Sequence, residues 1–293
     1  MDFIAALENP RIIRGIIEAI SFLIDETYLY AYPSGVKMNA IDSSHVAMLL
    51  AQLPKEIFTE YECKEQFKIG LNVADISKIL RRAKSEDTVE LIRKSEEPNT
   101  LLIRMKSERS TRTFKLKSKE IQEYDEKEEN IMETFEETLQ DKFTSSISME
   151  GPLLDEIIKD ALIISDLIKV QIMSAESLIN FLAYDESGEV EVELDLKGGG
   201  GGILDSEVKG DSEGLYSLNF LENIIKIQAV VDNFKISLGS NIPMKMEGLF
   251  GENGRIVYLL APRVEDEEED EFDEDFDAED FGDDFDDDID LDE

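Results

Sequence analysis

The sequence predicts an α+β protein in which one structural unit is repeated, with antiparallel sheets and helices packed on one face of them. Two observations lead to this prediction. Segments rich in β-branched and aromatic residues, separated by turn residues, outnumber the helical segments. A helix–strand–helix order also recurs at a nearly constant spacing along the chain. Many strands with few helices are typical of antiparallel sheets covered on one face.

The first helix of each repeat is amphipathic. After Pro10, the residues at positions 12, 13, 16, 17 and 20 are apolar, which is the spacing of a helix with one buried face. An offset of 141 residues brings these positions onto 153, 154, 157, 158 and 161, and Pro152 matches Pro10. Proline is favoured in the first turn of a helix, so we expect both helices to begin at these prolines.

The strand and the second helix that follow also repeat. Residues 36–42 match residues 179–185 at an offset of 143. A second amphipathic segment at 73–84 matches 217–231 at an offset of 145. The offset grows steadily, as it does when loops lengthen between elements that keep the same order. Three matches in the same order predict a duplication.

The remaining strands and the boundaries follow from the same pattern. Further strand-like segments are Thr27–Tyr32, Met48–Leu53, Tyr61–Leu71, Thr88–Lys94, Thr100–Ser107 and Thr111–Leu116. We expect an N-terminal domain over 1–117 and a C-terminal domain over 143–264. The Glu- and Lys-rich segment 118–142 is expected to join them as an extended interdomain connector, and 265–293 to form an acidic disordered tail.

The charge is unevenly distributed along the chain. The formal net charge is −38, but residues 265–293 hold 21 of the 68 acidic residues and none of the 30 basic ones. Residues 1–264 therefore carry a net charge of −17. Net charge governs solubility and encounter with partners, whereas binding depends on where the charges lie, so this acidity does not exclude nucleic acid as a partner.

Residues suited to catalysis are scarce. His45 is the single histidine and Cys63 the single cysteine, and no nucleophile elbow, phosphate-binding glycine loop or carboxylate–histidine metal spacing occurs. We therefore expect no enzymatic activity, no metal and no cofactor. No apolar run reaches membrane-spanning length. One cysteine excludes an intrachain disulfide, which fits a reduced cytoplasm.

Three sequence blocks stand in order on this duplicated frame. They are SGVKMNAIDSSHV at 34–46, SKIL at 77–80 and LLAPRV at 259–264. In these blocks the chain resembles DNA polymerase sliding clamps of the proliferating cell nuclear antigen (PCNA) family, archaeal type, and further similarity extends this to nearly all of 1–264. The resemblance implies the DNA-clamp fold, with two similar domains per subunit. Three such subunits, a homotrimer, are then expected to close head to tail into a ring around duplex DNA.

The resemblance also implies a function, partners and a location. Members of the family act as DNA polymerase processivity factors and as docking hubs for replication and repair enzymes, and they bind double-stranded DNA without reading its sequence. The implied protein partners are DNA polymerase, the clamp loader, flap nuclease and ligase, which dock through short peptide motifs. The implied location is the cytoplasm, in association with the nucleoid, or the nucleus if the source is a eukaryote.

In the family, the four helices of each subunit build the inner wall of the ring. Here the four helical segments carry a summed charge of +2, within a body that carries −17. The expected DNA-binding residues are Arg14, Lys78, Arg81, Arg82, Lys84, Lys159 and Lys226. The third helix is net acidic, and Ser21 and Ile163 stand where many relatives have basic or polar residues. Attraction to DNA should therefore be weaker or uneven.

Partners of the family insert a motif of one glutamine, one aliphatic residue and two aromatic residues into an apolar pocket beside the connector. By position, the pocket here comprises Ile41, His45, Val46, Met48, Pro243, Leu259, Ala261 and Pro262, with Ile131, Met132 and Phe135 as the candidates contributed by the connector. We expect His45 to be pocket wall without a catalytic role. Leu259 replaces a tyrosine of some relatives, which should reduce aromatic stacking in the pocket.

Two alternatives to a homotrimeric DNA clamp remain open. One is an acidic protein–protein scaffold that keeps the clamp fold without encircling DNA, and the other is one subunit of a heterotrimeric clamp. Edge strands near 110–117 and 184–194 are expected to form the subunit contacts. For the acidic tail, the alternative to a solvating segment is competition for the partner pocket or the DNA-binding bore, anchored by Phe272, Phe276, Phe281 and Phe285.

Overall fold

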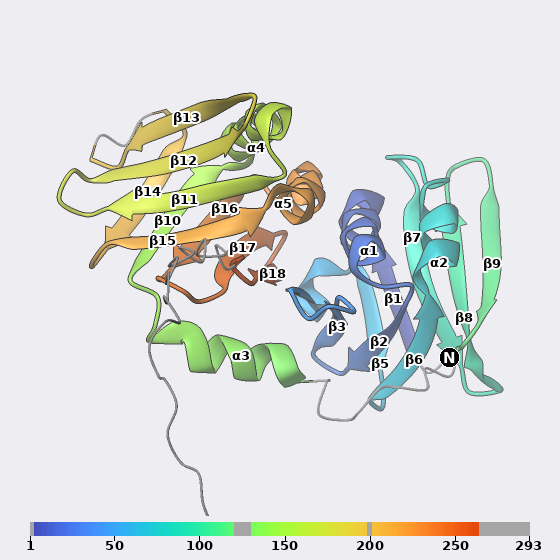
Figure 1. The fold of residues 1–293 in the computed structure, drawn as a ribbon. Helices are drawn as coiled ribbons and strands as arrows, with labels where there is room; N and C mark the ends of the chain where they lie inside the picture. Colours follow the sequence, from blue (N-terminus) through green and yellow to red (C-terminus); the bar gives the residue numbers. More distant parts are fainter. Residues whose placement is uncertain (1–2, 120–129, 198–200, 264–293) are drawn as a thin grey trace, which may run out of the picture.

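The repeated unit is visible in the order of the elements (Figure 1). The computed structural model describes residues 3–119, 130–197 and 201–263. The first half consists of β1 (Phe3–Leu7), α1 (Pro10–Leu23), β2 (Glu26–Tyr32), β3 (Gly35–Ile41), β4 (Ala47–Pro54), the 3₁₀ helix η1 (Lys55–Ile57), β5 (Glu60–Cys63), β6 (Phe67–Asn72), α2 (Val73–Leu80), β7 (Thr88–Lys94), β8 (Glu97–Lys106) and β9 (Thr111–Lys117).

The second half repeats this order of strands and α-helices. It consists of β10 (Ser145–Glu150), α4 (Gly151–Ile164), β11 (Leu167–Met173), β12 (Leu178–Asp185), β13 (Gly188–Asp195), β14 (Ile203–Val208), β15 (Ser212–Ser217), α5 (Leu218–Ile225), the 3₁₀ helix η3 (Lys226–Ala229), β16 (Asn233–Leu238), β17 (Met244–Phe250) and β18 (Gly254–Leu260). Between the halves lies α3 (Ile131–Gln140), which stands outside the repeat.

The strand pairing repeats as well. The sheet β5-β1-β7-β8-β9 of the first half has the same order as β14-β10-β16-β17-β18 of the second, and β6-β2-β3-β4 has the same order as β15-β11-β12-β13. Antiparallel pairing of β18 with β4, in which Leu259 lies opposite Met48, joins strands of both halves into one nine-stranded sheet. The predicted α+β fold on a duplicated antiparallel frame is therefore confirmed.

The helices pack their apolar faces against the sheets. The side chain of Asn9 accepts a hydrogen bond from the backbone N–H of Arg11, and Pro10 occupies the first turn, so the start of α1 is capped. Ile17 of α1 and Ile158 of α4, which are equivalent in the repeat, are 1% and 0% exposed. Full burial of one such side chain contributes roughly 1.5–3 kcal/mol, so the apolar spacing seen in the sequence is what positions both helices.

Two expectations from the sequence are wrong. The segment 61–71 is not one strand, because it is divided between β5, which pairs with β1, and β6, which pairs with β2 in another sheet. The exposed polar residues 64–66 form the turn between them. The connector is not extended throughout, because residues 131–140 form α3. Met132 and Leu139 lie about two turns apart on one helical face, and that face is buried.

Several expectations cannot be compared with the structure. The acidic tail, 265–293, with its four phenylalanines, and the connector residues 120–129 lie outside the described residues. The domain boundaries at 117 and 143 remain predictions. Within the described ranges, no helix combines the length and the apolar character that are needed to cross a membrane.

Candidate functional site

Helices from both halves lie next to one another and form a continuous row (Figure 1). α1 packs against α2, α4 packs against α5, and α1 also contacts α5 and η3 across the junction of the halves. At that junction the rings of Phe22 and Phe220 meet edge to face, with their centroids 5.4 Å apart. We call this surface, in the order α2, α1, α5 and α4, the helix row.

The cations expected to face DNA lie on the helix row, except for Arg82 and Lys84, which lie just after the end of α2. The exposed ones are Lys78, Arg81, Arg82, Lys84, Lys159 and Lys226. Arg14 on α1 is half-buried. Arg81 and Lys226 are the C-cap residues of the equivalent helices α2 and α5, where the helix dipole favours a positive charge. The structure thus brings the predicted cations of both halves onto one surface.

Most of these cations already have an acidic partner. The pairs are Lys78–Asp75 (3.5 Å), Arg81–Glu18 (3.5 Å), Lys84–Glu86 (3.9 Å), Lys159–Asp155 (2.7 Å) and Lys226–Glu222 (3.9 Å). The side chains of these five cations are all more than half exposed. Exposed pairs contribute only about 0–1 kcal/mol each, so a phosphate group can replace the carboxylate at little cost. Four of these pairs join residues two to four positions apart, a spacing that the sequence already shows, whereas the Arg81–Glu18 pair joins α2 to α1 and depends on how these helices pack.

A second candidate site lies on the outer face of the nine-stranded sheet, where β4 pairs with β18. Met48 and Leu50 of β4 lie opposite Leu259 and Val257 of β18. Together they belong to a small apolar cluster that is separate from the main core. We call this strip of four side chains the partner groove.

The loop at one end of the partner groove is held by a buried aspartate. The carboxylate of Asp42 accepts hydrogen bonds from three backbone N–H groups, including that of Val46 at 2.7 Å. Between them His45 adopts a φ of 55° and is exposed. The carbonyl of Val46 accepts a hydrogen bond of 2.8 Å from the N–H of Ala261, which ties the loop to the segment after β18. The sequence prediction missed Asp42, although an aspartate before two serines is typical of a turn.

α3 lies across the partner groove and fills it. Met132 is 0% exposed and Leu139 is 6% exposed, and both pack into the apolar cluster of the groove. At the start of the helix, a carboxylate oxygen of Glu133 lies 2.5 Å from Nζ of the buried Lys37. The side chain of Asn130 also accepts a hydrogen bond from Lys37, at 3.1 Å.

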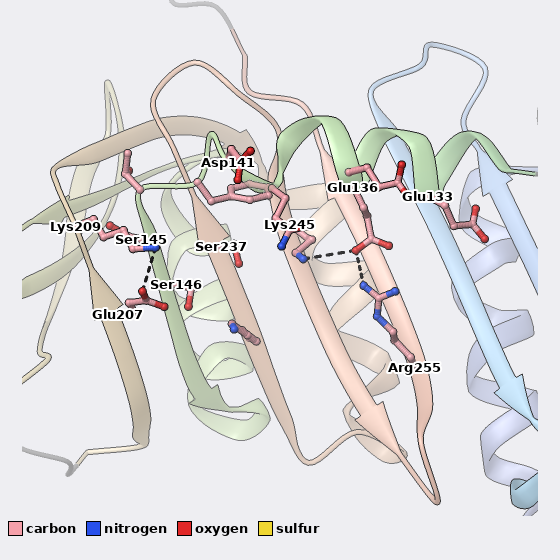
Figure 2. Close-up of a pocket in the computed structure, with 15 residues that line it drawn as sticks. Glu133, Glu136, Asp141, Ser145, Ser146, Glu207, Lys209, Ser237, Lys245 and Arg255 are labelled. Carbon is pink, nitrogen blue, oxygen red and sulfur yellow. Dashed lines mark hydrogen bonds and ion pairs between the residues drawn. The ribbon is translucent and has the colours of Figure 1, made fainter.

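A charged cluster holds the middle of α3 against the sheet. Glu136 forms an ion pair with Arg255 of β18 and a second, at 3.5 Å, with Lys245 of β17. Figure 2 shows Glu136 pointing from α3 toward both cations, beside a polar cavity of about 610 Å³. Glu247 is a second acidic partner for both. Desolvation lowers the pKa of Arg255, but the hydrogen bonds with Glu247 and Glu136 outweigh it and raise the pKa above its usual value.

Nine of the predicted pocket residues fall into two groups, whereas the other two, His45 and Phe135, are exposed. The structure brings Met48, Leu259, Ile131 and Met132 together in the apolar cluster of the partner groove. Partly buried side chains form the second group, and they are Ile41, Val46, Pro243, Ala261 and Pro262. Ile41 lies directly opposite Met48 across the pairing of β3 with β4. The sequence prediction missed Leu50, Val257 and Leu139, whose burial depends on how α3 packs.

The comparisons with known proteins agree with this arrangement. A family model for the N-terminal domain of proliferating cell nuclear antigen matches residues 2–130. A DNA polymerase sliding clamp from Pyrococcus abyssi is 34% identical over 266 residues, which cover 91% of this chain and 100% of that protein. The chain belongs to the PCNA family of DNA polymerase sliding clamps.

Other sliding clamps support the same assignment. The DNA polymerase sliding clamp 1 of Thermococcus kodakarensis is 32% identical over 91% of this chain and 100% of its own length. A crystal structure of PCNA from Thermococcus kodakaraensis has a TM-score of 0.78 at 24% identity, covering 89% of this chain and 100% of that chain, and so shares the fold. The assignment to the sliding-clamp family, made from the sequence, is thereby confirmed.

Proposed function

We propose that three copies of this chain close into a ring around double-stranded DNA. One observation carries the proposal: β9 and β13 are each the last strand of a sheet. In the repeat, β9 is equivalent to β18 and β13 is equivalent to β4. β18 and β4 pair with each other within one copy, so β9 of one copy can pair in the same way with β13 of the next. Each copy offers one strand of each kind, which is what a closed head-to-tail ring requires.

The two edge strands are complementary in charge and in apolar pattern. On its outer face β9 carries Lys115 and Lys117, whereas β13 carries Glu189, Glu191, Glu193 and Asp195. On the core side both strands have half-exposed apolar residues, which are Phe114, Leu116, Val190, Val192 and Leu194. A pairing that keeps the two core sides together therefore sets lysines against carboxylates on the outer face.

We infer that the helix row faces the DNA in this ring. Its exposed cations supply contacts to phosphates without reading bases, and their weak ion pairs yield readily to phosphate. The charge on the row is uneven, because α1 and the turn after α2 carry most of the excess positive charge. DNA is therefore held mainly against the first half of each copy, and its attraction falls as salt rises.

We further infer that the chain acts without catalysis, as a processivity factor for DNA polymerase and a docking hub for the clamp loader, flap nuclease and ligase. The relatives at 32–34% identity share the name of DNA polymerase sliding clamp. The partner groove supports docking, because an apolar strip rimmed by ordered backbone suits the burial of aromatic anchors of a short peptide.

The mass of the purified full chain in solution tests ring closure. We expect three copies; a stable monomer would instead point to one subunit of a heterotrimer. The double variant Lys115→Glu with Lys117→Glu should lose the trimer, because it sets like charges against β13. Adding Glu189→Lys and Glu191→Lys to that variant should restore it. A trimer that survives the first two substitutions would contradict pairing through these strands.

Polymerase extension on primed DNA tests encirclement of DNA. Charge reversal at Lys78, Arg81 and Lys226 should reduce stimulation of the polymerase and make the remaining stimulation more sensitive to salt. Reversal at Lys209, which is exposed and lies outside the helix row, is the matched control and should change neither. If all of these variants stimulate the polymerase like the natural chain, the clamp fold serves here as an acidic scaffold.

A further inference from the structure

The junction of the two halves presents aromatic rings beside the cations of the helix row. Phe22 of α1 is 41% exposed, and its ring meets that of Phe220 of α5 edge to face, with the centroids 5.4 Å apart. We call these two rings the aromatic pair. A phosphate group is charged and strongly hydrated, so it gains nothing from apolar contact. The aromatic pair suits a ligand that brings aromatic side chains together with negative charge.

The excess positive charge of the helix row lies in the first half. On α1, α2 and the turn at 81–86, six cations stand against three carboxylates, which leaves a net charge of +3. The carboxylates, Glu18, Asp75 and Glu86, lie 3.5–3.9 Å from their cations in exposed pairs, which are weak and can be exchanged. Together with the aromatic pair, the six cations form a surface that we call the basic face: they are Arg11, Arg14, Lys78, Arg81, Arg82 and Lys84.

The acidic tail, residues 264–293, carries the chemical groups that the basic face fits. It holds 21 acidic residues and no Lys or Arg. Its four phenylalanines each follow an acidic residue directly, and they are Phe272, Phe276, Phe281 and Phe285. Carboxylates can replace phosphates beside the cations, and the phenylalanine rings can pack on the aromatic pair.

The tail begins within reach of the basic face. The N–H of Arg263 donates a hydrogen bond of 2.7 Å to the carbonyl of Leu215 on β15. β15 leads directly into α5, so Phe220 is five residues from Leu215 and at most about 18 Å away. Phe272 is nine residues after Arg263, and nine residues span up to about 30 Å. Such a short tether gives the tail an effective concentration on the order of millimolar.

Two other surfaces of the same chain repel the tail. The outer face of β13 carries three glutamates and one aspartate, and the strand has no basic residue. α3, which lies beside the partner groove, carries three glutamates and no basic residue. Like charges disfavour close approach, so charge directs the tail to the basic face.

We propose that the acidic tail docks on the basic face when DNA is absent, and that DNA displaces it. Displacement rests on the DNA-facing role proposed above for the helix row, whereas docking of the tail does not. DNA and the tail need the same cations, so the apparent affinity for DNA is lowered by the fraction of molecules in which the tail is docked. Changes that loosen the tail without altering its charge therefore strengthen binding of DNA.

Carbodiimide cross-linking of the full chain tests docking, because the reagent joins a lysine to a carboxylate that touches it. Trypsin cuts after Lys and Arg, so it releases the tail as one peptide, 264–293. We expect this peptide to be linked to Lys78 and Lys84 without DNA, and released from both at saturating DNA. The matched control is Lys209, which is 68% exposed against 75% for Lys78 and lies outside the helix row. Lys209 should be linked to the tail far less.

Fluorescence anisotropy with a short labelled DNA duplex tests the competition. The full chain with all four tail phenylalanines replaced by alanine keeps the charge of the tail. It should bind DNA about three- to tenfold more tightly, the effect of losing one or two aromatic contacts. Phe22→Ala should act in the same direction. Leu249→Ala, which removes a 65% exposed side chain outside the helix row, is the control and should change nothing.

The outcomes separate docking from displacement. Tail cross-links as frequent at Lys209 as at Lys78 overturn docking, and so does an unchanged DNA affinity in both phenylalanine variants. Cross-links to Lys78 that persist at saturating DNA overturn displacement. If the tail is linked to Lys78 but neither the natural chain nor any variant binds DNA, docking stands, and the DNA-facing role of the helix row fails together with displacement.

Discussion

The two halves of the chain share their strand pairing but differ in what they bury. Among the described residues, every buried charged side chain lies in the first half, and these are Lys37, Asp42, Asp87 and Glu90. The buried polar side chains of the second half belong to four serines and one asparagine. The two halves therefore share one strand pairing with and without buried charge, so the strand pairing itself does not require the buried charges.

The buried charges of the first half hold features that the second half does not have. Lys37 binds the start of α3, and Asp42 orders the loop beside the partner groove. Asp87 forms an ion pair with Arg112 of the edge strand β9. Each of these contacts supports a surface proposed here for binding, whereas the second half uses its exposed charges on β13. These contacts are thus found in the first half alone, although both halves have the same strand pairing.

The largest effect is expected where the halves are most alike. Ile17→Ala and Ile158→Ala remove equivalent buried side chains from α1 and α4, and each should lower the free energy of unfolding by about 2–5 kcal/mol. Urea denaturation measures both. Ile163→Ala on the exposed face of α4, where the side chain is 78% exposed, should change it by less than about 0.5 kcal/mol. A strong loss in only one half would show that the two cores are packed differently.

A smaller effect is expected when one charged side chain is neutralised in each half, and the loss of unfolding free energy should differ between the halves. Glu90 lies opposite Ala6 of β1, and Lys235 lies opposite Ser148 at the equivalent place in the second half. Glu90 is 2% exposed and pairs with Arg104 and Lys106.

Glu90→Gln leaves two cations without their carboxylate and should lower the free energy of unfolding by about 2 kcal/mol. This is less than for a fully buried pair, because Arg104 and Lys106 are 25% and 47% exposed. Lys235→Gln, at an exposed site, should change it by less than about 0.5 kcal/mol. Equal losses from the two substitutions in urea denaturation would contradict the contrast between the halves.

A stabilising change is expected at Tyr216. Its side chain is 0% exposed, and its hydroxyl has no hydrogen-bond partner among the described residues. In the first half, Leu71 stands at the equivalent place and avoids this cost. Tyr216→Phe should raise the free energy of unfolding by about 1 kcal/mol, measured by thermal or urea denaturation. Tyr184→Phe, at a half-exposed residue, is the control; a loss of stability in Tyr216→Phe would mean that the hydroxyl does have a partner.

The smallest expected effect concerns acid stability. Asp211 accepts hydrogen bonds from the hydroxyl and the backbone N–H of Ser174, at 2.5 and 2.8 Å, and these lower its pKa below the ordinary value of 3.8. A lowered pKa in the folded state contributes stability above the ordinary pKa and loses it as the pH falls through the lowered value. Gln66, at the equivalent place in the first half, does not titrate. Asp211→Asn should therefore flatten the fall of the urea midpoint below about pH 4, and an unchanged fall would contradict this role.

The local patterns of the sequence predicted much of the frame. Apolar spacing located α1 and α4 to within a residue or two, and the matches between halves predicted the duplication. Both signals are local, since a helix or strand repeats its buried positions within a few residues. The pocket residues Met48 and Leu259 were also predicted, but through resemblance to a family, and the structure places them opposite each other.

Tertiary structure alone decided the features on which function depends here. The sequence predicts that Met132 belongs to the connector. Only packing against the β4–β18 pair shows that this part of the connector is a helix and that its side chains fill the partner groove. The polar turn at 64–66 sends β5 and β6 to different sheets, which a run of strand-like residues does not reveal. The cations of the helix row meet carboxylates on neighbouring turns and helices, as Arg81 meets Glu18. Sheet partners, groove occupants and the ion pairs between elements, such as Arg81–Glu18, join residues far apart in the chain, so their energies depend on distances that no local pattern contains.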